Sequence, residues 1–441
     1  MQSKRNLVRL AVVTITLVSG LIATPALARE AIAFVGAHLI PIDGPPIEDG
    51  VLVISEGSIT AVGTRDRVRI PKDAQIIDAA GQTIMPGLVD THSHVGGGWA
   101  ADRSAPIQPD VSVYDSINVR DSGFRRALAG GVTTANVMPG SGHLMSGQTV
   151  YVKHRAGNTI DEWVWRDDGG RPLGGMKMAN GTNSRRDPPF PGTRGKSAAL
   201  VREQFVAALD YRRKLEAAGD DAEKVPDRDL AMEALLEVLD GTRMVHHHTH
   251  RHDDIMTILR LREEFGFRVV LHHVSDAWKV ADEIAAAGVP SSLILVDSPG
   301  GKLEAMHIGY ESGGVLEKAG AAVAFHTDDW ITDSRLFLRM AALAVRGGMS
   351  REGALEALTL APAQMMDLGD RIGSLTVGKD ADFVILDGDP FSVYTKVLET
   401  WVDGDLRFDR SDEKDRLWAV GGYGAGQPRA VGGCCQRMEE E

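Results

Sequence analysis

Hydrophobic and polar positions follow two different periods along this chain of 441 residues. From residue 131 to residue 346, short apolar runs alternate with stretches in which apolar side chains recur every three or four positions. The first pattern is typical of buried strands, and the second is typical of amphipathic helices. The expected strand–helix pairs are 243–249 with 253–264, 267–273 with 276–287, 291–296 with 308–319, and 321–327 with 334–346, preceded by strands at 131–137 and 176–179. Alternating strands and helices build parallel sheets, and about 275 residues of such units suit eight repeats, so the pattern predicts an α/β fold, a (β/α)8 TIM barrel.

The two ends of this region have the shorter period of β-structure. Residues 51–55 and 58–62 flank a turn-like Glu56-Gly57 pair, and similar patterns occur at 373–378, 382–386 and 400–402. We expect the two β-rich segments to pair into one small composite β-sandwich. The expected organisation is a sandwich built from 29–85 and 366–412, a barrel over 86–365 with a helical insertion near 180–240, and a C-terminal tail over 413–441.

The first 28 residues have the pattern of a signal peptide. Lys4, Arg5 and Arg9 precede an apolar run over 10–22, and a small-x-small cleavage pattern follows at 26–28. The apolar run is too short to cross a bilayer comfortably. The sequence therefore predicts export to a periplasm or to the outside of the cell, with no membrane span after cleavage.

Composition narrows the class of partner. The formal net charge is −13 and no basic patch stands out, so nucleic acid is not an expected partner. A small-molecule substrate is expected instead, and the sequence leaves a homo-oligomer open. The chain has two cysteines, the adjacent Cys434 and Cys435, which could bridge each other only with strain and are assigned no role.

Two histidines follow an apolar run at the start of the predicted barrel. In His92-Ser93-His94 the imidazoles are two positions apart, so a strand ending here would point both rings to the same side. Zinc–nitrogen bonds of roughly 2.0–2.1 Å suit such a pair. A His-x-His pair alone favours two unrelated polar residues, but other predicted strands also end in residues that can bind metals.

Those further residues lie at Lys177, at 246–250, at 272–273 and at 328–329. Because a barrel collects the carboxyl ends of its strands at one rim, we expect them to meet there. His246, His248 and His250 would share one strand face, whereas His272 and His273 would point to opposite faces, so that only one of them enters the barrel.

In these residues the chain resembles the amidohydrolase superfamily, in its imidazolonepropionase-like or prolidase-like branch. The resemblance covers about residues 31 to 410 and is carried by Pro86-Gly87 with Asp90-x-His92-x-His94, His248-Thr249-His250-Arg251-x-Asp253-Asp254-Ile255, Leu271-His272-His273, Phe325-His326-Thr327-Asp328 and the segment from Gly378 to Leu386. The combination is specific to the superfamily, and no single motif is specific to a substrate. The resemblance implies a barrel that carries a composite β-sandwich from both chain ends.

The resemblance also implies the roles of the residues. It implies that His92 and His94 bind a more buried metal, and that Lys177 reacts with CO₂ to form a bridging carbamate, with Lys153 as a rival candidate. His248 and His273 are implied as ligands of a second metal, which leaves His250 as a second-layer or substrate contact. Asp328 is implied as a metal ligand and as the general acid/base. The expected cofactor is Zn²⁺, one or two per chain, although other divalent metals suit the same ligands.

The sequence therefore predicts an exported, metal-dependent hydrolase in which a metal-activated hydroxide attacks an amide, a cyclic amide or a dipeptide. A deaminase of the same superfamily is the alternative enzyme, and an inactive barrel that serves as a scaffold is the alternative outside catalysis. Weaker candidates for substrate binding are His143, His250, Arg251 and Lys302, and Asp329 is expected to be a turn or cap residue.

Overall fold

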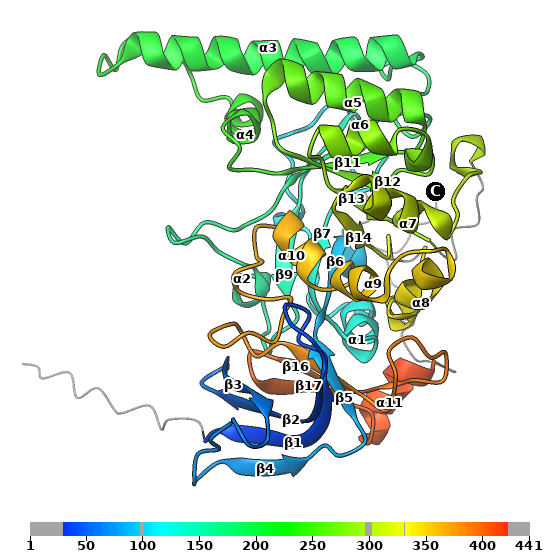
Figure 1. The fold of residues 1–441 in the computed structure, drawn as a ribbon. Helices are drawn as coiled ribbons and strands as arrows, with labels where there is room; N and C mark the ends of the chain where they lie inside the picture. The colour runs from blue at the N-terminus through cyan, green and yellow to red at the C-terminus, as the bar shows by residue number, and fades with distance from the viewer. Residues whose placement is uncertain (1–29, 98–100, 296–301, 330, 422–441) are drawn as a thin grey trace, which may run out of the picture.

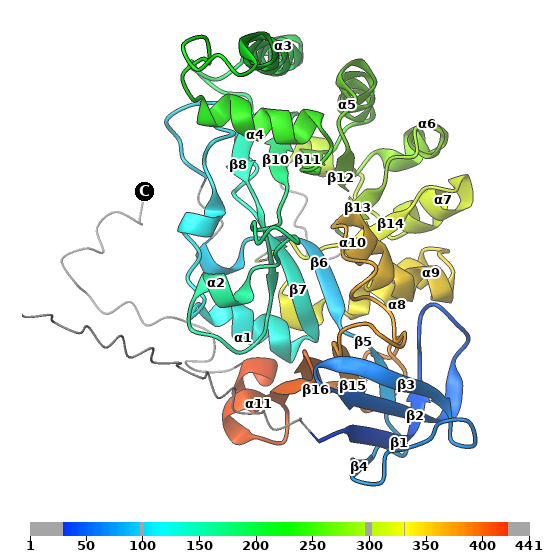
Figure 2. The same cartoon turned by 90° about the vertical axis from the view of Figure 1, so that its left-hand side faces the viewer.

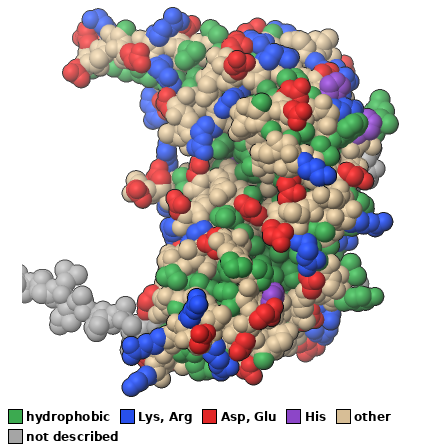
Figure 3. Space-filling model, viewed as in Figure 1, with side chains coloured by type: hydrophobic (Ala, Val, Ile, Leu, Met, Phe, Trp, Pro, Cys, Tyr) green, Lys and Arg blue, Asp and Glu red, His purple; other side chains and the backbone are tan. Residues whose placement is uncertain are grey.

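The computed structural model describes residues 30–97, 101–295, 302–329 and 331–421. The predicted signal peptide and the two cysteines lie outside these residues. Within them, a β-sheet at one end of the molecule supports a larger α/β unit (Figure 1). On the face drawn in Figure 3, basic and acidic side chains are interspersed rather than separated. Among the described residues, none of the helices combines the length and the apolar character that a bilayer crossing requires.

Both β-rich segments of the chain belong to one sheet. Its eight strands are β1 (Ile32–Leu39), β2 (Ile47–Ser55), β3 (Ser58–Thr64), β4 (Gln75–Asp78), β5 (Thr83–Pro86), β15 (Phe383–Leu386), β16 (Val397–Val402) and β17 (Asp405–Asp409). The two segments join where β5 pairs antiparallel with β15, and Phe383 lies opposite Pro86. The rings of Phe34, Phe383 and Trp401 pack together behind this seam, with centroids 5.2–5.6 Å apart. The burial of these aromatic rings thus stabilises the pairing of the N-terminal strands with the C-terminal strands.

One expectation for the C-terminal segment is wrong, and a further element was not expected. Residues 373–378 form turns rather than a strand, because Gly373 and Gly378 have φ angles of 90° and 93°, which end an extended conformation. Residues 413–420 form a helix, α11 (Glu413–Val420), within the segment that was expected to be a tail. Its N-terminus is capped by Asp412, whose side chain accepts hydrogen bonds from two backbone N–H groups.

The central unit contains two further sheets. One has the order β14-β13-β12-β11-β10-β8, and the other has the order β6-β7-β9. The strands are β6 (Leu88–Ser93), β7 (Val132–Val137), β8 (Met145–Gln148), β9 (Val150–Lys153), β10 (Met176–Ala179), β11 (Val245–Thr249), β12 (Val269–His273), β13 (Ser291–Leu293) and β14 (Val323–Phe325). The pairs from β10 to β14 are all parallel, as is β6 with β7. Sequence alternation therefore predicted the parallel strands correctly but missed β8 and β9, which are both antiparallel to a neighbour.

The two sheets meet at both edges without forming one continuous closed ring in the described residues. On one side the backbone N–H of Asp328 donates to the carbonyl of His92 at 2.9 Å, and Ser93 and Asp329 form a parallel bridge. On the other side β8 and β9 are separated only by Thr149, whose N–H turns to the carbonyl of Gly175. This arrangement brings the carboxyl ends of β6, β11, β12 and β14 together.

Helices cover the outer face of these strands (Figure 2). They are α1 (Ser122–Ala129), α2 (Ile160–Trp163), α3 (Arg194–Ala218), α4 (Leu230–Leu239), α5 (His252–Phe265), α6 (Ala281–Ala286), α7 (Glu311–Ala319), α8 (Arg339–Arg346), α9 (Arg351–Glu356) and α10 (Leu360–Met365). The insertion near 180–240 contains the two expected helices, α3 and α4. The expected helices 276–287 and 334–346 each begin with a short 3₁₀ turn, η3 (Ala277–Lys279) and η5 (Ser334–Leu336).

Candidate metal centre

The strand β6 delivers His92 and His94 to the rim. The Nδ1–H of His94 donates to the carbonyl of Met138 at 2.8 Å, and this fixes the ring so that Nε2 points inward. That Nε2 lies 2.9 Å from Asp328 Oδ1, and His92 Nε2 lies 3.3 Å from the same oxygen. Both rings are buried. The two histidines therefore converge on one carboxylate, as alternation along a strand predicts.

Asp328 follows β14 and has an unusual backbone conformation. Its φ angle is 49°, in the left-handed region that non-glycine residues rarely adopt. Burial by itself would raise the pKa of its carboxyl group, but the hydrogen bond with His94 and the nearby basic side chains hold that pKa below its ordinary value. Asp328 is therefore an anion in a group of imidazoles. Its neighbour Asp329 points elsewhere and accepts a hydrogen bond from the Ser334 backbone at 3.3 Å, as expected of a turn residue.

Three more histidines gather beside Asp328. The ring centroids of His248 and His273 are 4.2 Å apart, and His250 lies 4.7 Å and 5.2 Å from them. His273 Nε2 is 3.9 Å from Asp328 Oδ2. The side chain of His250 is oriented by a 2.7 Å hydrogen bond between Nδ1 and Ser275 Oγ. The structure thus brings both His248 and His250 to His273, and all three offer ligand atoms within 4.8 Å of one another.

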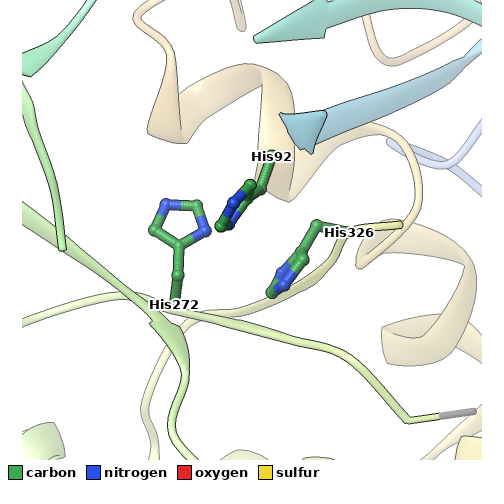
Figure 4. A group of neighbouring side chains, drawn as sticks. All are labelled: His92, His272 and His326. Atoms are coloured by element: carbon green, nitrogen blue, oxygen red, sulfur yellow. The ribbon is translucent and has the colours of Figure 1, made fainter. Parts of the chain in front are cut away.

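A third group lies on the other side of His92. Figure 4 shows the rings of His92 and His326 side by side, with the ring of His272 facing them. The centroids of His92 and His326 are 4.9 Å apart in a stacked arrangement, and His272 and His273 each lie 5.0 Å from His92. The expectation that only one of His272 and His273 enters the site is therefore wrong. At His273 the φ angle is 70°, so the strand ends there and the alternation of side chains no longer applies.

Buried polar side chains support His272 and His326 from below. His272 Nε2 lies 3.0 Å from His246 Nδ1, and His246 Nε2 lies 2.9 Å from the hydroxyl of Tyr151. The ring of His326 is held by a 2.8 Å hydrogen bond between Nδ1 and Ser292 Oγ. Sequence reasoning gave His272 and His326 little weight. The available signal was that His326 lies two positions before Asp328, directly after an apolar strand.

Lys177 lies at the centre of the histidines. It is fully buried, and its Nζ is 3.0 Å from His92 Nε2 and 3.1 Å from the sulfur of Met138. Burial lowers its pKa to about 7; Asp328 opposes this shift and Lys302 adds to it. A substantial fraction of this amine is therefore neutral at neutral pH. A neutral amine is the form that can react with CO₂.

Lys153 has a different environment. Its Nζ lies 2.6 Å from Asp380, 3.0 Å from Asp382 and within contact of Asp403, beside the strands of the composite sheet. Burial opposes its charge, but the three carboxylates together raise its pKa. Lys153 is therefore a firmly charged structural cation, and the structure does not bring it to the histidines.

The donor set of this centre fits divalent cations. Burial lowers the pKa of six of these imidazoles, to about 3 for His250 and His326, and keeps those six rings in the neutral form that binds metals: His92, His248, His250, His272, His273 and His326. Several buried ring nitrogens have no hydrogen-bond partner among the described residues: Nδ1 of His92, both nitrogens of His248, and Nε2 of His250, His273 and His326. Orphaned buried nitrogens are costly unless another ligand satisfies them.

A cavity of about 400 Å³ opens above this centre. His94, His248 and Asp328 line its floor, and His143 and Lys302 line its wall. Neither ring nitrogen of His143 has a hydrogen-bond partner among the residues that the structure describes, and burial together with nearby arginines lowers the pKa of this ring to about 4. Arg251 lies in a different cavity, with its guanidinium 2.8 Å from Asp253. Of the four weaker candidates, the structure therefore brings His143, His250 and Lys302 to the centre and leaves Arg251 outside.

Comparison with known proteins identifies the family. Residues 205–408 match the profile described as "Amidohydrolase family". The crystal structure of an amidohydrolase from Thermotoga maritima is 33% identical, with a TM-score of 0.80, and the match covers 86% of this chain and 100% of that one. The chain belongs to the amidohydrolase superfamily. Members of this superfamily have a TIM-barrel fold and depend on metals, so the candidate ligands lie in a frame known to hold such ions.

Two curated amidohydrolase relatives extend the comparison. The imidazolonepropionase of Deinococcus radiodurans is 28% identical over 376 residues, covering 78% of this chain and 86% of that protein. The protein named amidohydrolase tasK, from Hapsidospora irregularis, is 28% identical over 435 residues. That match covers 87% of this chain but only 43% of the longer protein. These relatives support a hydrolase activity for this chain, but they do not identify the type of bond that it cleaves.

Proposed function

We propose that this amidohydrolase cleaves a C–N bond in a small amide, a cyclic amide or a dipeptide, with bound divalent cations and with Asp328 as general acid and base. The observation that supports this most strongly is the convergence of three histidine rings on the partly buried carboxylate of Asp328, beside buried ring nitrogens that have no hydrogen-bond partner among the described residues. A scaffold protein has no need for such an arrangement, because every orphaned nitrogen lowers its stability.

In this proposal His92 and His94 would hold one cation, and His248 and His273 would hold a second one. Lys177, as a carbamate, and Asp328 would supply oxygen ligands to them. Zn²⁺ suits this set of nitrogen and oxygen ligands. When bound, such a cation acts as a Lewis acid on the scissile carbonyl and lowers the pKa of water toward about 7.

Asp328 moves the proton in this proposal. Its carboxylate faces the cavity and is already ionised, so it can accept a proton from the attacking water. The same carboxyl group then protonates the leaving nitrogen. His143 lies on the cavity wall, and both of its ring nitrogens lack a partner in the described part of the chain, so this ring is available to hold a polar group of the substrate.

A deaminase would use the same groups but release ammonia.

The proposal is tested by loading the purified protein with Zn²⁺, measuring metal per chain, and screening dipeptides, N-acyl amino acids, cyclic imides and aminated heterocycles. We expect one or two Zn²⁺ per chain and release of an amine from an amide. Chelation should abolish turnover and Zn²⁺ should restore it. A chain that binds no zinc and cleaves no amide would contradict the proposal.

We also propose that the mature enzyme acts outside the cytoplasm, in a periplasm or secreted, on the basis of the signal-like pattern over residues 1–28. Sequencing the N-terminus of the protein from an extracellular or periplasmic fraction tests this. A mature protein that retains residue 4 would contradict export by cleavage.

A further inference from the structure

Three basic side chains line the same cavity as the metal centre. Arg103 follows β6, Arg186 follows β10, and Lys302 directly precedes η4 (Leu303–Ala305). Each comes from a different rim loop, and none of them belongs to the proposed metal ligands. We call these three residues the cationic wall.

The cationic wall has no carboxylate partner among the described residues. Arg186 donates to the carbonyl of Gly142, and its guanidinium lies 3.7 Å from the centroid of the Phe190 ring. These contacts hold the side chain in place and leave its charge unneutralised. Arg103 and Lys302 likewise form no ion pair with a described residue, although the more distant carboxylates of Asp328 and Glu304 attract Lys302. Arg103 repels Arg186.

The acidic groups near this wall are already engaged. Glu304, two positions after Lys302, accepts hydrogen bonds from Thr182 and from Arg194 Nη2 at 3.1 Å. Asp102, next to Arg103, accepts the backbone N–H of Ser104 at 2.8 Å. Among the described residues that line the cavity, Asp328 is the one carboxylate, and it faces His94.

The positive charges of the cationic wall would be stabilised by an anion that binds in the cavity. The whole chain is acidic, with a formal net charge of −13, so three basic side chains on one wall, without an ion pair to a described residue, are a local exception. Like charges in a cavity repel each other more strongly than on an open surface, because less water screens them. An anion that enters would relieve this repulsion and form charge-assisted hydrogen bonds with the guanidinium groups.

We propose that the cationic wall binds a carboxylate of the substrate, so that the enzyme prefers N-acyl amino acids and dipeptides with a free carboxyl group over neutral amides. This inference rests on the proposed function, because it gives a substrate class to the same site. A cavity of about 400 Å³ suits a substrate of this size. The metal centre would engage the scissile carbonyl while the wall holds the carboxylate.

The test compares two substrates that differ only in this charge. The zinc-loaded enzyme is given alanyl-leucine and alanyl-leucinamide, and kcat/KM for cleavage of the same peptide bond is measured for both. We expect the free acid to be preferred by about tenfold to hundredfold, as for hydrogen bonds to charged groups. Added salt should reduce this preference and leave cleavage of the amide nearly unchanged.

Substitutions assign the preference to the wall. Arg186→Gln, Arg103→Gln and Lys302→Met should each lower kcat/KM for the acid more than for the amide, and Arg186→Lys should retain part of the preference. Arg185→Gln is the matched control, because this neighbouring arginine lines a separate cavity with Arg194 and His252. Thermal melting and zinc content confirm that each variant is folded and loaded.

Binding without turnover separates the two proposals. Titration calorimetry with N-acetylleucine and N-acetylleucinamide should show tighter binding of the acid, and Arg186→Gln should remove the difference. Equal cleavage and equal binding of acid and amide would overturn the proposal that the cationic wall binds a carboxylate of the substrate. Selective binding of the acid with no cleavage of any amide would instead overturn the proposed function and leave the wall supported.

Discussion

Lys177 Nζ lies 3.0 Å from His92 Nε2 in a fully buried site, where no carboxylate of the described residues forms an ion pair with the amine. A charged ammonium at this distance from a neutral imidazole would repel a metal, whereas a carbamate would attract one. The lowered pKa of Lys177, about 7, results chiefly from burial and makes the neutral amine available. The buried position of Lys177 beside His92 therefore favours the neutral amine that the proposed chemistry needs.

Replacing Lys177 by Gln should reduce zinc binding to one ion per chain or fewer and lower turnover by at least about a hundredfold, because glutamine cannot form the proposed carbamate ligand. Metal analysis and steady-state kinetics measure this, and intact mass should show a CO₂ adduct only in the parent protein. Full zinc occupancy in Lys177→Gln would remove the lysine from the ligand set.

Replacing Lys153 by Met should lower the stability of the protein and leave its zinc binding unchanged, which is the opposite of the effect expected at Lys177. It would leave Asp380, Asp382 and Asp403 without their shared cation, and breaking a buried pair in this way costs about 3–5 kcal/mol of unfolding free energy. Zinc binding by the folded fraction should be unchanged. Chemical denaturation and metal analysis of the same sample distinguish the two lysines. A stable variant that has lost zinc would reverse their roles.

Asp328→Asn should keep most of the metal and lose about 10²–10⁴-fold in kcat, because an amide cannot accept the proton of water. The matched control is Asp329→Asn. In the parent protein the carboxylate of Asp329 accepts a hydrogen bond from Ser334 and does not face the metal centre. This control should retain most of its activity. If both variants turn over at the parent rate, Asp328 is not the general base.

Asp276 should make the protein's stability depend on pH below 4. Although burial acts to raise its pKa, hydrogen bonds from Lys279, His252 and His307 lower it from 3.8 to about 2. The folded protein therefore binds a proton at this carboxylate less readily than the unfolded chain does. The stabilisation is complete above pH 4 and is lost as the pH falls from 3.8 through 2.

Comparison of the parent with Asp276→Asn isolates this effect. The difference in unfolding free energy between the two proteins should be largest above pH 4 and should shrink toward pH 2, as measured by urea denaturation across this range. Glu203→Gln, which alters an exposed carboxylate, should show no such trend. A difference that stays constant with pH would mean that Asp276 does not stabilise the fold through its charge.

Local periodicity predicted much of the framework. The strands at 132–137 and 176–179 and the long α5 are where the hydrophobic pattern places them, since these segments are both apolar and regular. The pattern failed where glycines with positive φ angles interrupt it, at 373–378, and where short antiparallel strands lie within a loop, at β8 and β9.

The sequence by itself determined which residue types could bind a metal and that two of them, His92 and His94, share a strand face, because side-chain alternation is a property of a single strand. Tertiary structure alone decided which lysine lies among the histidines, that His272 and His273 both lie beside His92, and that three rim loops bring unpaired cations to one cavity. These outcomes depend on how separate strands and loops pack against each other. Burial and charge at a point in space are set by neighbours that lie far away along the chain.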